Sequence, residues 1–464
     1  MGAYKIAQVL RNQGWDIEVI DFFEFWKKDE LVTLLKQRVN KNTKFIGYGT
    51  LFYNDIDIPK FFFNTIKQQW PELITIFGTQ TNSKINDLNI NYAISGWAEN
   101  AIVELLKYLF SNGDRPIMTE KGYTKKIDAN IHYPDYPTKT LSIEYQDRDF
   151  IQPYETLTTE FSRGCKFKCK FCNFPVLGVK GDYTRSAEDF SYEIKKVYDQ
   201  FGVKKFIVAD ETFNDSTRKI IKFADQVEKF DFTPCFSGFA RADLMVRHPE
   251  QKEHLLRMNF VNHYYGIESF NYESAKSIGK GMKTEELQKG LIDIKNYFET
   301  HGTGNFRATL SFIIGLPYET VYSLEQTGNW LNDNWRNQSI ESFVMEIPTS
   351  SIYKKSELSK NYKKYGYRQY SKKITPDKQK QLDEYFSTYS TGASPYNILI
   401  WQNEYLNIFD AIKINENFQN KKEESPLGNF DLFAHKELDY NSKNDDNSYV
   451  DELFTVYKEQ KLSY

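Results

Sequence analysis

The N-terminal part of the chain alternates between helical and extended patterns of apolar residues. Apolar residues at helical spacing predict helices at residues 4–13, 30–39, 58–69 and 99–109. Short apolar runs between them predict strands at Ile17–Ile20, Phe45–Tyr48, Ile74–Phe77 and Tyr92–Ser95. Because strands that alternate with helices indicate a parallel sheet covered on both faces, we expect residues 1–110 to form an α/β domain.

A second α/β pattern extends over residues 155–348. The predicted strands are Thr156–Ser162, Lys205–Ala209, Pro234–Ala240, His263–Ile267, Arg307–Gly315 and Phe343–Ile347. The predicted helices between them are residues 187–200, 216–230, 284–297 and 324–335. In barrels built from such units the catalytic groups lie at the carboxyl ends of the strands, so we expect the chemistry at those positions.

Two regions lack this regular alternation. Residues 111–154 contain several prolines and little periodicity, and we expect a linker that wraps between the two domains. Residues 349–464 begin with tyrosine-rich helical stretches, including Tyr396–Ile412, which we expect to cap the barrel and line a substrate pocket. The polar segment 417–447 is expected to be flexible, and a last helix is predicted at Tyr449–Lys458.

Composition excludes several classes of protein. A formal net charge of −3 provides no broad basic surface for nucleic acid, although a local basic groove remains an alternative. The sequence has no apolar stretch of membrane-spanning length, and from its N-terminal residues we expect no secretory signal. The four cysteines do not make a disulfide framework, so we expect a reducing, cytoplasmic location.

Three cysteines lie in the stretch Phe161–Cys172 with the spacing C-x3-C-x2-C. Thiolates are soft ligands that suit zinc or iron–sulfur clusters. A structural zinc site needs four ligands, and this stretch contains no histidine. A cluster held by Cys165, Cys169 and Cys172 would leave one iron open for a small-molecule chelate. The alternatives are three structural thiols, or a zinc site completed by a distant ligand.

This spacing, with the aromatic Phe171 before the last cysteine, resembles the cluster loop of radical S-adenosylmethionine (SAM) enzymes. The resemblance implies a partial (β/α)6 TIM-like barrel and a [4Fe-4S] cluster on the three cysteines, with Phe171 in contact with the cofactor. It implies that SAM binds the fourth iron and that an electron from the cluster cleaves SAM to a 5'-deoxyadenosyl radical. A reductant such as flavodoxin or ferredoxin is then a required partner.

Two further segments at predicted strand ends resemble motifs of the same family. Arg241, in Phe239–Asp243, resembles an Arg-x-Asp signature, which implies an ion pair with the SAM carboxylate. A surface salt bridge with Asp243 is the alternative. Asp210–Asp215 resembles an acidic turn that faces the active site, and its alternative is an N-cap for the next helix.

The next two strand ends supply the remaining SAM motifs. Gly266, Glu268 and Ser269 resemble a Gly-Ile-Glu-Ser motif, which implies contacts to the ribose or methionine part of SAM. Residues 311–319 resemble the adenine motif G-x-I-x-G-x-x-E, in which Ile313 packs on the adenine and Gly315 allows close approach of the backbone. Ser311 replaces the first glycine of this motif. Glu319 falls one residue late, so we expect it to support the turn or cap the next helix.

The N-terminal domain resembles the Rossmann-like cobalamin-binding domain of one radical SAM subgroup. Residues 2–7 resemble its first helix, Gly78-Thr79 sits where a loop approaches the corrin, and Ser95–Glu99 resembles its Gly-Glu-Gly-Glu turn. The strand that precedes the first helix in that subgroup is missing. No histidine occurs before His132, so the usual lower ligand of cobalamin is absent. The alternative is a degenerate Rossmann-like domain that packs on the barrel or binds substrate.

The resemblance implies a radical SAM enzyme that acts on a small-molecule or peptide substrate, which the sequence does not identify. Cys235 alone cannot hold a second cluster, and this argues against sulfur insertion. Methyl transfer that depends on cobalamin needs no further cysteine and is the leading hypothesis. The alternatives are cobalamin-free rearrangement, cyclisation or oxidation, and a non-catalytic iron–sulfur protein. No catalytic side chain is assigned.

Overall fold

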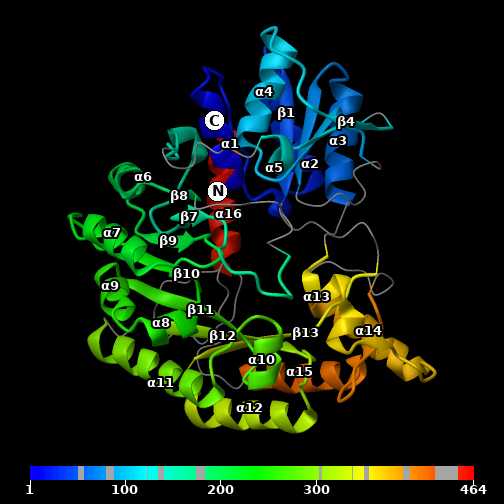
Figure 1. Cartoon of the computed structure of the whole chain (residues 1–464). Coiled ribbons are helices and arrows are strands. Elements are labelled where there is room, and N and C mark those ends of the chain that lie inside the picture. The colour runs from blue at the N-terminus through cyan, green and yellow to red at the C-terminus, as the bar shows by residue number, and fades with distance from the viewer. Residues whose placement is uncertain are drawn as a thin grey trace.

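The computed structural model describes residues 1–50, 57–79, 88–122, 124–133, 141–173, 183–302, 306–336, 338–349, 355–389, 398–423 and 448–464. Figure 1 shows two helix-covered sheets, one formed by the N-terminal part of the chain and one by its middle part. The α/β fold class predicted from the sequence is confirmed. None of the helices in these ranges is both long and apolar enough to cross a membrane.

The N-terminal sheet has five strands in the order β1-β2-β3-β5-β4. Its parallel strands are β1 (Phe45–Thr50), β2 (Ile74–Thr79), β3 (Tyr92–Ser95) and β5 (Thr124–Asp128), and the antiparallel edge strand is β4 (Thr119–Lys121). The helices around it are α1 (Gly2–Arg11), α2 (Lys28–Arg38), α3 (Asp57–Gln69), α4 (Glu99–Phe110) and α5 (Ala129–His132). Apolar residues of α2 and α3 form one buried cluster and those of α1 and α4 form another, so helices cover both faces.

The second sheet has six parallel strands in the order β13-β12-β11-β10-β9-β6, so each strand lies next to its neighbour in the chain. The strands are β6 (Thr156–Thr159), β9 (Lys205–Val208), β10 (Cys235–Ala240), β11 (Phe260–Glu268), β12 (Arg307–Ile314) and β13 (Ser339–Val344). The helices that follow them are α6 (Ala187–Phe201), α7 (Thr217–Val227), α8 (Ala242–Arg247), α9 (Gln251–Arg257), α10 (Tyr272–Ser277), α11 (Thr284–His301) and α12 (Val321–Asn334). Because all six strands are parallel, their carboxyl ends lie along one edge.

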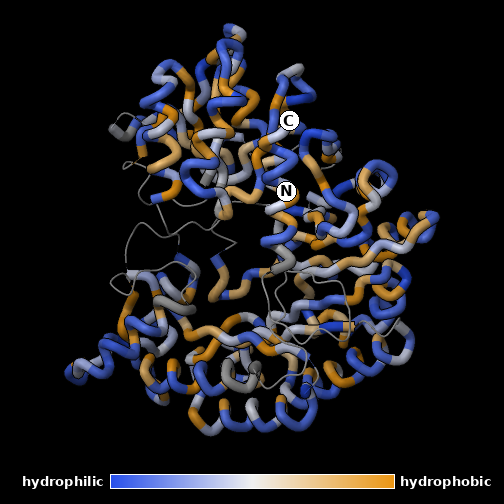
Figure 2. Tube along the Cα trace, turned by 180° about the vertical axis from the view of Figure 1, so that it is seen from behind, coloured by the Kyte–Doolittle hydropathy of each residue, from blue (hydrophilic) through white to orange (hydrophobic). Residues whose placement is uncertain are grey.

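The C-terminal elements pack against both sheets. Those beside β12 and β13 are α13 (Glu357–Lys360), α14 (Pro376–Tyr389), α15 (Ile408–Glu423) and the antiparallel pair β14 (Arg368–Gln369) and β15 (Trp401–Gln402). The last helix, α16 (Ser448–Ser463), returns to the N-terminal domain, where Phe454 and Tyr457 join the buried cluster of α2 and α3 (red in Figure 1). Figure 2 shows hydrophobic residues concentrated along the strands and hydrophilic residues on the outer helix turns.

The structure corrects two predictions about the N-terminal sheet. Ile17–Ile20, predicted as a strand, lies outside the sheet because side chains take up its backbone groups: Arg11 donates a hydrogen bond to the Ile17 carbonyl at 2.7 Å. The N–H of the next residue, Asp21, donates to the Tyr457 hydroxyl of α16 at 2.8 Å. Residues 119–121 and 124–128, predicted as part of a linker, form β4 and β5, since β4 pairs with β5 and β5 pairs in parallel with β3.

The predicted helix at Tyr396–Ile412 is wrong in its first half. Residues 396–397 lie outside the described ranges, and residues 398–407 form a bridge to Pro348, β15 and a turn. Helix α15 begins only at Ile408, because the Asn407 side chain accepts the N–H groups of the next turn. The predicted last helix is confirmed as α16, and the segment 417–447 lies partly on α15 and otherwise outside the described residues.

Candidate functional site

The cysteine loop lies at the carboxyl ends of the strands of the second sheet. It follows the short strand β7 (Ser162–Arg163), which pairs with β8 (Tyr183–Thr184), and Gly164, with φ +97°, turns the chain into the loop. Its middle is held by two other segments. The Lys170 N–H donates to the Ile278 carbonyl, and the Leu358 N–H donates to the Lys170 carbonyl, both at 2.8 Å. The turn after α10 and helix α13 therefore hold the loop in place.

The three thiols of this loop are partly exposed, and none of the chain's cysteines forms a disulfide. Burial raises the pKa of the Cys165 thiol, against the opposing hydrogen bonds from the Phe167 N–H and the Thr212 side chain. Across the described ranges, no three His, Cys, Asp or Glu side chains are grouped closely enough to hold a metal ion. The donor chemistry fits a soft metal, because the loop offers three thiols separated by lysines and aromatic residues rather than carboxylates.

Arg241 lies between the end of β10 and the cysteine loop. Its guanidinium makes two hydrogen bonds to Asp243, at 2.9 and 2.8 Å, and lies 4.1 Å from the centre of the Phe167 ring. Its third nitrogen is 3.8 Å from the Cys169 sulfur. Asn214 holds the Arg241 backbone through hydrogen bonds at 2.9 and 3.0 Å. The salt bridge with Asp243 that the sequence suggested is thus present, but it is largely buried and not on the surface. It holds the guanidinium so that one nitrogen lies next to the Cys169 sulfur.

Glu268 ends β11 in a left-handed conformation, with φ +67°. Its Oε1 pairs with Lys280 at 3.0 Å, and Lys280 also donates to the Gly266 carbonyl. A Cβ at Gly266 would lie 2.5 Å from Glu268 Oε1, so the carboxylate folds back over Gly266 and a side chain there would displace it. The predicted pair Gly266 and Glu268 is therefore brought together, with Lys280 as the charge partner of the glutamate.

Ser269 and Gly315 meet at the Glu319 carboxylate. Glu319 accepts the N–H groups of Gly315 and Leu316 at 2.8 and 3.1 Å, and the Ser269 hydroxyl donates to its other oxygen at 2.6 Å. The expectation that Glu319 supports this turn is confirmed, while Thr320 caps α12. Gly315 has φ +94°, and the Trp401 ring lies so close that a Cβ on Gly315 would be 2.4 Å from it.

Asp210 links two strand ends. Its buried carboxylate accepts the Phe161 N–H at 2.8 Å and the Ser162 hydroxyl at 2.7 Å, and Lys219 lies 3.6 Å away. The cap of α7 is Ser216, whose side chain accepts the Lys219 N–H, so the capping role considered for this acidic turn is present. Phe171 and Ile313, both expected to contact cofactor, are partly exposed and pack against the core of the second sheet.

The face of the second sheet opposite its helices carries a polar row that the motifs did not reveal. The Tyr264 hydroxyl donates to Glu341 of β13, and its ring lies 4.9 Å from Phe239 of β10. Near them, Asn262 Oδ1 and Thr309 Oγ1 are buried and have no hydrogen-bond partner among the described residues. The sequence does contain a pattern that indicates this row: in β11, polar or small residues occupy every second position, from Asn262 to Glu268.

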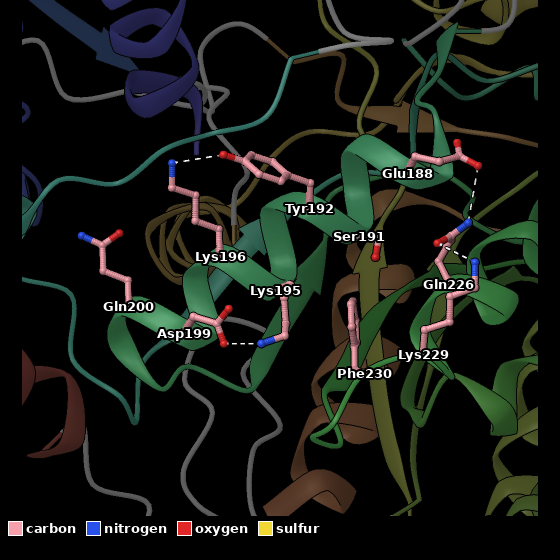
Figure 3. Close-up of a pocket in the computed structure, with 10 residues that line it drawn as sticks. All are labelled: Glu188, Ser191, Tyr192, Lys195, Lys196, Asp199, Gln200, Gln226, Lys229 and Phe230. Carbon is pink, nitrogen blue, oxygen red and sulfur yellow. Dashed lines mark hydrogen bonds and ion pairs between the residues drawn. The ribbon is translucent and has the colours of Figure 1, made fainter.

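Figure 3 shows a pocket between α6 and α7, on the helix-covered side of the second sheet. Several of its polar side chains pair with one another, as in Lys195 with Asp199 and Gln226 with Glu188. None of its lining residues belongs to the cysteine loop or to a strand end, so this pocket is separate from the candidate site.

The part of the sequence that forms this site matches a known protein family. Residues 159–331 match the family model of the Radical SAM superfamily. The protein contains a Radical SAM domain. Enzymes of this family use a [4Fe-4S] cluster and SAM.

Three curated relatives align with about half or more of this protein. A putative methylthiotransferase, MJ0865 of Methanocaldococcus jannaschii, is 24% identical over 76% of each chain. The hopanoid C-3 methylase of Methylococcus capsulatus is 22% identical over 75% of this chain and 64% of its own. The anaerobic magnesium-protoporphyrin IX monomethyl ester cyclase of Synechocystis is 31% identical over 49% of this chain and 48% of its own.

Solved structures share the fold of both sheets. TsrM, a radical SAM methyltransferase from Kitasatospora setae, has a TM-score of 0.62 at 12% identity and covers 90% of this chain and 87% of its own. OxsB, a cobalamin-dependent SAM radical enzyme, has a TM-score of 0.53 at 16% identity and covers 91% of this chain and 58% of its own. The arrangement of an N-terminal α/β sheet ahead of a six-stranded radical SAM sheet is thus a known fold.

Proposed function

We propose that the protein cleaves SAM reductively at a [4Fe-4S] cluster held by Cys165, Cys169 and Cys172. The observation that carries the proposal is one loop with three partly exposed thiols beside the Arg241 guanidinium, at the carboxyl ends of the barrel strands. Cluster assembly would draw the three thiols together, and their exposure leaves them accessible. When bound, the cluster supplies the electron that breaks a carbon–sulfur bond of SAM.

Arg241 and Glu268 are the proposed charged contacts to SAM. One Arg241 nitrogen lies 3.8 Å from Cys169, so a carboxylate bound next to the cluster would come within its reach. Glu268 pairs with Lys280 through Oε1, and its Oε2 is the proposed acceptor for a ribose hydroxyl or the ammonium group. Phe171, Gly266 and Ile313 would supply apolar and backbone contacts. Ser269 and Gly315 would act through the turn that Glu319 holds together.

The second part of the proposal is methyl transfer that uses cobalamin bound to the N-terminal domain. In parallel α/β sheets, ligands bind outside the carboxyl ends of the strands. The chain leads from the end of β3 directly to Glu99, which pairs at 2.6 Å with Arg163 beside the cysteine loop. This edge of the N-terminal sheet is therefore the proposed corrin site, and it faces the cluster loop. The fold shared with TsrM, solved with cobalamin and a [4Fe-4S] cluster, supports the assignment.

A second candidate is radical oxidation or cyclisation without cobalamin. Its support is the 31% identity to a magnesium-protoporphyrin IX monomethyl ester cyclase over about half of this chain. Residues 1–131 contain no histidine that could serve as a lower cobalt ligand, and this also favours the second candidate.

The remaining proposals concern domains, partners and location. We assign the barrel to residues 155–348 and the C-terminal cap to residues 349–464, and we add β4 and β5 to the N-terminal domain of residues 1–110. A one-electron donor such as flavodoxin or ferredoxin is the proposed partner, and the substrate class is a small molecule or peptide. A reducing cytoplasm is the proposed location, because the loop thiols must remain reduced.

The test is anaerobic reconstitution with iron, sulfide and hydroxocobalamin, followed by desalting and an absorption spectrum. We expect broad absorbance near about 400 nm that is lost when the three loop cysteines become alanine. Corrin bands that survive desalting, together with S-adenosylhomocysteine formed on turnover, would support methyl transfer. SAM cleavage without retained corrin would favour the second candidate. Reduced, cluster-loaded protein that releases no 5'-deoxyadenosine from SAM would overturn the proposal.

A further inference from the structure

Four charged side chains meet where the N-terminal domain touches the cysteine loop. Arg163 pairs with Glu160 at 2.9 Å and with Glu99 at 2.6 Å, and Lys5 of α1 also pairs with Glu160. The side chains are between 1% and 11% exposed. Two cations and two anions balance one another in this group, which we call the Arg163 network. Two of its members come from the N-terminal domain and two from the barrel.

The N-terminal side of the network is rigidly held. Gly96, at the end of β3, has φ +90°, and a Cβ there would lie 2.6 Å from the Asn130 side chain. Asn130 Oδ1 accepts the Trp97 N–H at 2.9 Å, and the Trp97 ring lies 5.4 Å from the Arg163 guanidinium. Glu99 is the first residue of α4, where the helix dipole favours a carboxylate. Glu99 is thus a fixed anchor of the N-terminal sheet.

On the barrel side, the network is connected through the backbone to the first cysteine of the loop. Arg163 belongs to β7, where it pairs with Tyr183 of β8. Only Gly164 separates Arg163 from Cys165, and its φ of +97° is open to few other residues. A shift of the Arg163 backbone would therefore move Cys165. Residues of α1 and α4 both hold the Arg163 side chain: Lys5 acts through Glu160, and Glu99 pairs with the guanidinium directly.

The charges of the Arg163 network are better suited to fixing the relative position of the segments that carry them than to increasing the stability of the fold. Burial favours the neutral acid, but Arg163 and Lys5 outweigh it and lower the pKa of Glu160 to about 2. Glu160 thus stays charged while buried. Buried ion pairs often add little stability compared with apolar residues of the same size, because desolvation offsets their attraction. Their directional contacts do fix the relative position of the segments that carry them.

We infer that Glu99 and Arg163 are positioning residues that set the place of Cys165 relative to the N-terminal sheet. The inference rests on the proposed function in one respect, that Cys165 is a cluster ligand. Glu99 lies in a different domain from the cysteines and does not touch SAM in the proposed arrangement. It nevertheless controls the geometry of the cluster loop, and with it the distance between the cluster and a ligand on the N-terminal sheet.

The first test measures hydrogen–deuterium exchange of the cluster-free protein, so it needs neither cofactor nor substrate. The variants are Glu99→Gln, which keeps the shape of the side chain, and Glu99→Ala. The control is Glu104→Ala on the same helix, which removes a surface ion pair with Lys107. We expect Glu99→Gln to speed exchange roughly tenfold in peptides that cover residues 161–173 and 183–185, with the rest of the barrel unchanged.

Two results would overturn the inference. One is exchange in residues 161–173 that matches the Glu104→Ala control, and the other is an equal rise in every peptide, which would report unfolding instead of positioning. In the reconstituted enzyme, Glu99→Gln is expected to lower kcat for 5'-deoxyadenosine release several-fold while the KM for SAM and the iron content stay unchanged. If the wild-type enzyme cleaves no SAM, the proposed function is wrong. The exchange experiment still tests the positioning role, because it uses cluster-free protein.

Discussion

Gly315→Ala combines two separate costs at one position. The backbone there has φ +94°, and a Cβ would lie 2.4 Å from the Trp401 ring. Trp401 has little room to withdraw, because it is fully buried and its Nε1 donates to the Met345 carbonyl at 2.7 Å. Left-handed strain costs about 1 kcal/mol, and overpacking adds about 1–3 kcal/mol. We therefore expect the free energy of unfolding to fall by about 2–4 kcal/mol.

Gly14→Ala is the matched control. Gly14 has φ +85°, but nothing lies within 4 Å of its added Cβ, so only the strain of about 1 kcal/mol applies. Urea-induced unfolding of cluster-free wild type and both variants measures the difference. Equal losses for the two alanines would refute the reasoning, because the contact with Trp401 would then carry no cost. Gly14→Ala is also expected to leave SAM cleavage unchanged, since the added methyl group has no atom within 4 Å.

Three further outcomes follow from single side chains. Arg241→Lys loses the two-pronged contact with Asp243 and the stacking on Phe167, and we expect the KM for SAM to rise about tenfold in initial-rate assays; an unchanged KM would remove Arg241 from the SAM site. Glu341→Gln keeps the shape of the acceptor for Tyr264 but removes its charge. Because Glu341 belongs to the polar row on the sheet face opposite the helices, we expect this row to line the substrate site. The substitution should then weaken coupling of SAM cleavage to substrate turnover while uncoupled 5'-deoxyadenosine release continues, and equal loss of both would contradict this expectation. Burial raises the pKa of Glu155 to about 7, against the opposing hydrogen bond from the Gln152 N–H. A raised folded-state pKa means that the folded protein holds the proton more tightly than the unfolded chain. Stability is then greatest below about pH 4.5 for this group and falls as the pH rises to about 7. As the pH rises from 5 to 8, the free energy of unfolding of Glu155→Gln, measured with urea, should therefore increase relative to that of wild type by up to about 3 kcal/mol. If the two proteins lose or gain stability in parallel over this range, the burial argument is wrong.

The elements that the sequence predicted well are those whose own residues carry the signal. Tyr92–Ser95 was predicted as a strand and is β3 with the same bounds, since all four residues are buried and need a fully covered strand. The start of α11 at Thr284 also agrees, because polar residues with acidic side chains open its first turn. The cysteine spacing is likewise local, so the candidate cluster loop can be recognised from neighbouring residues alone.

Predictions failed where a distant segment supplies the partner. Ile17–Ile20 has the composition of a strand, yet Arg11 and the helix α16 occupy the position that a neighbouring strand would need. The sequence likewise did not indicate that Trp401, from β15, lies against Gly315. Nor did it show that the Ser269 hydroxyl donates to Glu319, 50 positions later in the chain. Periodicity shows which face of an element is buried, but it does not say what buries it.

The sequence by itself determined the class of fold, most of the strands and helices of the two sheets, and the resemblance to a family, because spacing and periodicity are properties of neighbouring residues. Only the tertiary structure decided which charges meet. Lys5 and Glu160 are 155 positions apart in the chain, and Glu99 reaches Arg163 from another domain. Such contacts depend on how two sheets dock, and docking is set by the summed burial of many side chains. The placement of the cysteine loop against the N-terminal sheet therefore became visible only in three dimensions.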